Sequence, residues 1–152
     1  MKIAIEHLNL DELKSFLQEQ AEDAFPDLKD AARLNMLAEK WHAYAEFCTC
    51  REDCGRLVGM IAFYANRQDC DVAYIPHVYI SMKYRGTGTF TSMLNQVTNY
   101  VYENGFDHIR LEVHKDNIRA QKAYLNNGFQ IDGNDIDKSI YMKYTIDKYD
   151  RV

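Results

Sequence analysis

Residues 83–94 read KYRGTGTFTSML and follow the apolar segment YIPHVYI, residues 74–80. The apolar segment predicts a strand, the glycines a tight turn, and the residues after them a helix. Free amides and the positive end of the helix dipole would meet at this turn, where they can bind an anion. Gly86 and Gly88 would let a diphosphate approach the backbone, and Arg85 adds charge. From the turn alone, a plain connection with a solvated arginine is an equal alternative.

Two common nucleotide motifs do not fit this turn. A Walker A loop continues its glycines with Lys and Ser or Thr, whereas Gly88 is followed by Thr89 and Phe90. A dinucleotide fingerprint needs a third glycine where Thr91 stands, and it lies in a βαβ unit rather than after antiparallel strands. The sequence therefore argues against a nucleotide triphosphatase and against a Rossmann domain.

The segments around the turn predict alternating strands and helices in a single domain. Before it, the patterns predict a strand, two helices, a β-hairpin and a third strand at residues 2–8, 10–25, 26–40, 41–67 and 72–80. After it, they predict a helix, a strand, a helix and a hairpin at residues 90–101, 109–113, 117–127 and 129–144. Asn9 or Asp11 should cap the first helix and Asp116 the last. Pro76 should mark an edge, a bulge or an interruption of its strand.

Composition sets bounds on size and partners. A chain of 152 residues, 47% of them hydrophobic, can bury one core, so residues 1–152 are expected to form one domain. A net charge of −5 argues against nucleic acid and anionic membranes as partners and suits an amine-bearing ligand. Without a long apolar run or a signal-peptide pattern, the chain is expected to be soluble and cytoplasmic.

The four cysteines match no common metal motif. Cys48, Cys50 and Cys54 lie in CTCREDC with Cys70 further on, and this spacing is unlike that of zinc sites. Reduced thiols around a hairpin are the favoured interpretation, and a metal or redox site is the minor alternative. We therefore expect no metal.

A second segment adds a family resemblance. Residues 110–130, RLEVHKDNIRAQKAYLNNGFQ, resemble the closing segment of the GNAT superfamily of acyl-CoA-dependent N-acetyltransferases, in which a strand is followed by Asn, Ala, Tyr and Gly-Phe. Here these are Asn117, Ala120, Tyr124 and Gly128-Phe129. The turn likewise resembles the family's signature R/Q-x-x-G-x-G/A, and the two motifs together span residues 73–131. The sixth signature position departs from the family, because it holds Phe90, which we expect to turn inward on the helix's apolar face.

The resemblance implies an α/β (α+β) GNAT fold, with a mixed, largely antiparallel central sheet flanked by helices. It implies an N-acetyltransferase that moves the acetyl group of acetyl-CoA directly to a primary amine, without a metal or a covalent intermediate. Backbone groups of one strand are then expected to bind pantetheine and the thioester carbonyl. The implied cofactor-binding residues are Val78, Tyr79, Ile80, Met82, Arg85, Gly86, Thr87, Gly88, Thr89, Phe90, Asn117 and Tyr124. A non-catalytic acyl-CoA-binding or sensing domain is the alternative.

The sequence offers one candidate for the general acid and several for the general base. Tyr124 takes the place of the family's general acid, since a phenol with a pKa near 10 keeps its proton at neutral pH. For the base we favour His77, because its strand should line the acyl site and an ordinary histidine pKa is near 6.5. Glu112 is the alternative base, on one face of its strand with His114, and a water chain is a third. A bulge at Pro76 would turn His77 to the other face.

The acceptor is not specified by any motif. Small amines, amino sugars, antibiotics, and the N-terminus or a lysine of a peptide or protein all remain open. A homodimer is also compatible with this sequence.

Overall fold

A computed structural model describes residues 1–66, 69–133 and 137–147. One seven-stranded sheet has the order β1-β2-β3-β4-β5-β7-β6. Its strands are β1 (Lys2–Glu6), β2 (Glu46–Arg51), β3 (Leu57–Tyr64), β4 (Val72–Ile80), β5 (His108–His114), β6 (Gln130–Ile131) and β7 (Ser139–Thr145). The helices are α1 (Leu10–Asp23), α2 (Ala31–Tyr44), α3 (Thr89–Glu103) and α4 (Ile118–Asn126), with the short 3₁₀ turns η1 (Pro26–Lys29) and η2 (Met82–Tyr84). Only β4 and β5 pair in parallel, so the predicted mixed, largely antiparallel sheet is confirmed.

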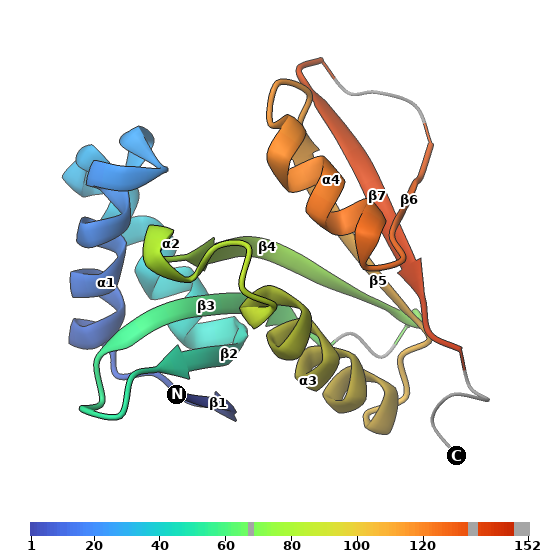
Figure 1. Cartoon of the computed structure of the whole chain (residues 1–152), viewed down its shortest axis with the longest axis horizontal. Helices are drawn as coiled ribbons and strands as arrows, with labels where there is room; N and C mark the ends of the chain where they lie inside the picture. Colours follow the sequence, from blue (N-terminus) through green and yellow to red (C-terminus); the bar gives the residue numbers. More distant parts are fainter. Residues whose placement is uncertain (67–68, 134–136, 148–152) are drawn as a thin grey trace.

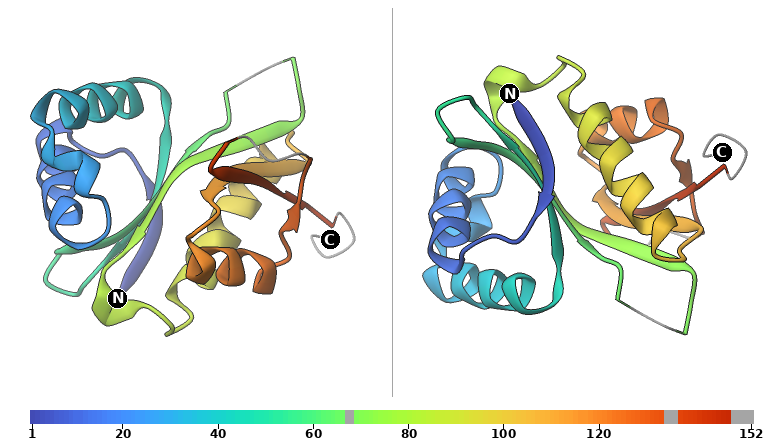
Figure 2. Two further views of the ribbon diagram at one scale, coloured as in Figure 1. Left: turned by 90° about the horizontal axis from the view of Figure 1, so that it is seen from above. Right: turned by 90° about the horizontal axis from the view of Figure 1, so that it is seen from below.

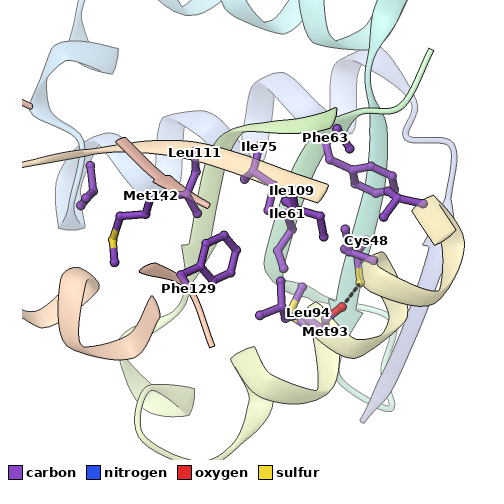
Figure 3. Packing of buried hydrophobic residues seen from close by; sticks show 14 of the residues in the cluster. Cys48, Ile61, Phe63, Ile75, Met93, Leu94, Ile109, Leu111, Phe129 and Met142 are labelled. Carbon is purple, nitrogen blue, oxygen red and sulfur yellow. Dashed lines mark hydrogen bonds between the residues drawn. The ribbon is translucent and has the colours of Figure 1, made fainter. Parts of the chain in front are cut away.

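Helices cover both faces of this sheet. The two views of Figure 2 show α1 and α2 on one face and α3 and α4 on the other. Strand β3 serves both layers, because Met60 and Ala62 pack under α1 and α2 while Ile61 and Phe63 pack under α3. Figure 3 shows the α3 layer, where Met93 and Leu94 meet the strand side chains. Within the described ranges, no helix is long and apolar enough to cross a membrane.

Asparagine side chains fix the first residues of two helices, α1 and α4. Asn9 caps α1 by accepting from the amide of Asp11 at 2.8 Å. At α4 the cap is Asn117, which accepts from the Ala120 amide at 3.1 Å, rather than the expected Asp116.

The second helix lies further along the chain than predicted, because residues 26–29 form the 3₁₀ turn η1 and α2 spans Ala31–Tyr44. Residues 41–44 continue α2 instead of opening the hairpin, because Trp41 extends the buried stripe begun by Leu34 and Ala38 at helical spacing. The last hairpin forms as expected from β6 and β7, although part of its predicted turn, residues 134–136, lies outside the described residues.

All four cysteines are free thiols. Cys48 and Cys50 are buried under α3, where burial raises the pKa of the Cys48 thiol to about 12. Among the residues that the structure describes, no three His, Cys, Asp or Glu side chains gather in a group that could hold a metal ion.

Strand β4 contains the irregularity expected at Pro76. Ala62 of β3 pairs with His77, but Tyr64 pairs with Tyr74, so β4 holds one residue more than β3 in this interval. This is a β-bulge, and it moves the following side chains to the other face of the sheet. Ile75 packs under α3, whereas Tyr79 packs under α1 and α2.

Candidate active site

The sheet opens between its two parallel strands. The β4–β5 pairing ends at Ile75 and Leu111, yet β4 continues to Ile80 and β5 to His114. Figure 1 shows the half formed by β5, β7 and β6 turning away from β4 beyond this point. From Pro76 onward, one edge of β4 therefore lacks a strand partner in the described structure, and its backbone can bind a ligand.

The glycine turn lies at the end of β4 and has the geometry of an anion site. Gly86 and Gly88 have φ of 74° and 86°, and Gly88 is the N-cap of the 15-residue helix α3. Within the described chain, the amides from Gly86 to Phe90 donate no hydrogen bond. A Cβ added at Gly86 or Gly88 would meet nothing within 4 Å, so the space above the turn is open. The turn can thus hold a diphosphate against free amides.

The threonine hydroxyls of the turn brace it. Thr87 Oγ1 donates to the Tyr84 carbonyl at 2.5 Å and lies 2.8 Å from Thr89 Oγ1. Phe90 turns inward as expected, and its ring packs edge-on against that of Tyr124 at 5.6 Å between centroids. The bulky sixth residue of the signature therefore lies beside the helix α4 rather than over the amides.

Arg85 differs from its expected role as a free positive charge. Its guanidinium pairs with Asp23 at 2.5 Å, and its Nε donates to the Ile80 carbonyl at 2.8 Å. Tyr79 donates to the same Asp23 carboxylate at 2.6 Å, and this bond, aided by Arg85, lowers the pKa of Asp23. Arg85 thus ties the turn to the end of α1, a contact between distant segments that the sequence pattern did not indicate.

We expect Gly88→Val to weaken acetyl-CoA binding by about 10-fold or more, the loss of one or two hydrogen bonds to a charged group. The new side chain both strains the positive φ and fills the space above the amides. Gly55→Val is the matched control, because Gly55 has φ of 92° and an equally open position in the β2–β3 turn. Calorimetric titration should show normal binding for Gly55→Val, and equal losses in both variants would contradict the assignment.

Tyr124 lies on α4 beside this opening. Its ring is held between Phe90 and Phe129, each at 5.6 Å between centroids. Burial raises the pKa of the Tyr124 phenol to about 12, so the phenol is protonated at neutral pH. No hydrogen bond from its hydroxyl forms within the described residues, which leaves the proton available to a ligand.

The other residues predicted to bind the cofactor lie in different parts of the structure around the opening. Val78 packs toward the α3 layer and Tyr79 toward α1, so these neighbouring side chains lie on opposite faces of the sheet. The Ile80 carbonyl is already engaged by Arg85, and Met82 is 68% exposed in η2. The Asn117 side chain caps α4 at the far side of the opening.

His77 does not face the opening. The bulge turns it under α1 and α2, where Nε2 lies 2.6 Å from Gln20 Oε1 and the ring is 8% exposed. Phe25 and Trp41 flank the ring at 4.5 and 4.8 Å between centroids. Burial lowers the pKa of His77 to about 4 rather than the expected 6.5, which removes our main reason for favouring it as the base.

Buried His77 should make the protein acid-sensitive. His77 has a pKa near 6.5 in the unfolded chain and about 4 in the folded protein, so between these values the unfolded chain binds more protons. The free energy of unfolding therefore falls as the pH drops from 6.5 toward 4. The loss from this group is up to about 3 kcal/mol. Thermal unfolding of wild type and His77→Gln across this range should show the steeper decline in wild type. Equal declines of stability in the two proteins would contradict the role of His77 in this acid sensitivity.

Glu112, the alternative candidate for the base, lies on the strand that borders the opening. It is exposed on β5, one residue past the last β4–β5 pair, and faces away from the α3 layer together with Arg110. The Arg110 guanidinium is bound to Asp132 at 3.1 Å and stacks 3.9 Å from the Tyr141 ring centroid. Glu112 therefore lies at the mouth of the opening.

Comparison with known proteins places this geometry in a family. The model of the acetyltransferase (GNAT) family matches residues 10–129. No curated protein matches. Among solved structures, the chain is similar to the PaiA N-acetyltransferase of Thermoplasma acidophilum in complex with coenzyme A, with 18% identity and a TM-score of 0.73 over 96% of this chain and 100% of that one.

Two further structures share the fold. An acetyltransferase of the GNAT family from Staphylococcus aureus Mu50 is 21% identical, with a TM-score of 0.73 over 95% of this chain and 99% of that one. A putative streptothricin acetyltransferase from Bacillus anthracis in complex with acetyl coenzyme A is 25% identical, with a TM-score of 0.61 over 68% of this chain and 64% of that one.

Proposed function

Because this chain belongs to the GNAT acetyltransferase family, we propose that it transfers the acetyl group of acetyl-CoA directly to a primary amine. The observation that carries the proposal is the open turn of free amides at Gly86 to Phe90, which follows the part of β4 that no longer pairs with β5. Similar folds bound to coenzyme A and acetyl coenzyme A support it.

The proposed reaction needs a base, a polarised carbonyl and an acid. Glu112, or a water that it orients, takes one proton from the ammonium form of the amine, and the neutral nitrogen then attacks the thioester carbonyl. Free backbone groups of β4 beyond Pro76 hold that carbonyl as its oxygen gains charge. When the carbon–sulfur bond breaks, the departing thiolate takes the proton of Tyr124, the nitrogen gives up its surplus proton to the Tyr124 phenolate, and the products are an amide and CoA.

Thiol release from acetyl-CoA with a panel of amines tests this function. The panel should contain amino acids, aryl alkyl amines, polyamines, amino sugars and short peptides, each run with and without protein. We expect amine-dependent thiol release for at least one class, with acetyl-amine formed in equal amount. A protein that binds acetyl-CoA but releases no thiol with any class would instead be a binding or sensing domain.

A further inference from the structure

A cavity lies beside the opening on the α1–α2 face of the sheet. It is open to solvent on one side, has a volume of about 350 Å³ and is lined by residues of η1, α2 and the strands β3 and β4. Ligand pockets span roughly 300 to 1,000 Å³, so this cavity has the size for a small molecule. The sequence pattern did not reveal it, because its walls come from segments far apart in the chain.

The floor of the cavity is aromatic and uncharged. The rings of Phe25 and Trp41 pack against His77 there at tilted angles. Tyr64 and Tyr74 line the cavity from paired positions on β3 and β4. His77 stays neutral at pH 7, because burial lowers its pKa to about 4. An apolar or aromatic group is therefore the natural occupant of the floor.

The rim of the cavity carries an excess of positive charge. Arg33 and Lys40 lie two turns apart on α2 and line the cavity with Leu37 between them. Neither forms an ion pair with any residue that the structure describes. Asp27 is the one carboxylate in the lining, so this rim is cationic although the whole chain has a net charge of −5. Such a rim favours a ligand with a carboxylate.

Tyr74 connects the cavity to the opening. It lines the cavity and pairs with Arg110 across the last parallel rungs of the sheet. Glu112 lies two residues beyond Arg110 on the same face of β5, next to this wall of the cavity, and its charge adds to burial in raising the pKa of Tyr74. A molecule seated in the cavity can thus extend its amine toward Glu112.

We propose that this cavity binds the acetyl acceptor, and that the acceptor is a small amino acid-like amine with a carboxylate and an apolar or aromatic side chain. The side chain occupies the floor, the carboxylate meets Arg33 and Lys40, and the amine points to the opening. The identity of the bound molecule as an acceptor rests on the function proposed above. The binding of that chemical class rests on the cavity alone.

Trp41 allows a direct binding test, because it is the single tryptophan of the chain and lies on the cavity floor. Phenylalanine and phenethylamine form the matched probe pair, since they differ only in the carboxylate. With and without CoA, phenylalanine should change Trp41 emission saturably, and phenethylamine should require about 10-fold higher concentrations. In Arg33→Ala/Lys40→Ala this difference should vanish, whereas Arg33→Lys/Lys40→Arg should keep it.

Turnover of the same pair separates the two proposals. Acetyl transfer that favours phenylalanine over phenethylamine by kcat/KM, with the preference lost in Arg33→Ala/Lys40→Ala, supports both. Efficient acetylation of amines with no preference for the carboxylate overturns the acceptor class and leaves acetyl transfer standing. Carboxylate-dependent binding at Trp41 without turnover of any amine overturns acetyl transfer and leaves the cavity assignment standing. No response of Trp41 to millimolar phenylalanine overturns the cavity assignment.

Discussion

Tyr124→Phe is expected to lower kcat by about 10²-fold or more, the usual loss when a general acid is removed. The substitution deletes only the hydroxyl, so the ring keeps its contacts with Phe90 and Phe129. Because no residue of the described chain binds this hydroxyl, its removal leaves no buried partner unsatisfied. Steady-state thiol release with an acceptor found in the amine panel measures the effect.

A matched tyrosine separates chemistry from packing. Tyr144 packs on Phe129 from β7 and takes no part in the proposed reaction, so Tyr144→Phe should retain nearly full turnover. Calorimetry should show that both variants bind acetyl-CoA like wild type. Turnover of Tyr124→Phe within a factor of about two of wild type would mean that water supplies the proton and that Tyr124 only packs.

Glu112→Gln should lower kcat/KM by a comparable factor, about 10² to 10⁴ for loss of a general base. The amide has the size of the carboxylate but cannot accept the proton of the amine. Because Glu112 is exposed on β5, the change should leave the melting temperature nearly unchanged. The comparison uses one amine with saturating acetyl-CoA over a range of pH.

Glu103→Gln provides the control, since Glu103 is an exposed carboxylate at the end of α3, away from the opening. It should behave as wild type. If Glu112→Gln turns over normally while His77→Gln loses the rate and retains its fold, the base would have to be reassigned to His77 despite its burial.

The fold could be predicted because its signals are local. The turn at residues 85–90 and the apolar stripe of α3 each lie in one short segment, and both appear where the pattern placed them. Trp41 shows the limit of this approach, since its strand-like neighbours suggested a hairpin while burial against α1 and the sheet kept it helical. Tertiary packing outweighed local propensity there.

The site could be predicted only in part. Pro76 indicated a bulge, but whether His77 then met solvent, ligand or core depended on Phe25, Gln20 and Trp41, which come from other elements. The contact between Arg85 and Asp23 joins residues 62 positions apart, and no hydrophobic pattern or motif in the sequence predicts it.

Titration calorimetry of CoA and acetyl-CoA into the wild-type protein tests the central claim most directly. If the glycine turn and the gap between β4 and β5 form an acyl-CoA site, both ligands should bind saturably at a single site and raise the melting temperature. Gly88→Val should lose most of this heat, and Gly55→Val should keep it. Absence of binding to the wild type at millimolar ligand would contradict the account.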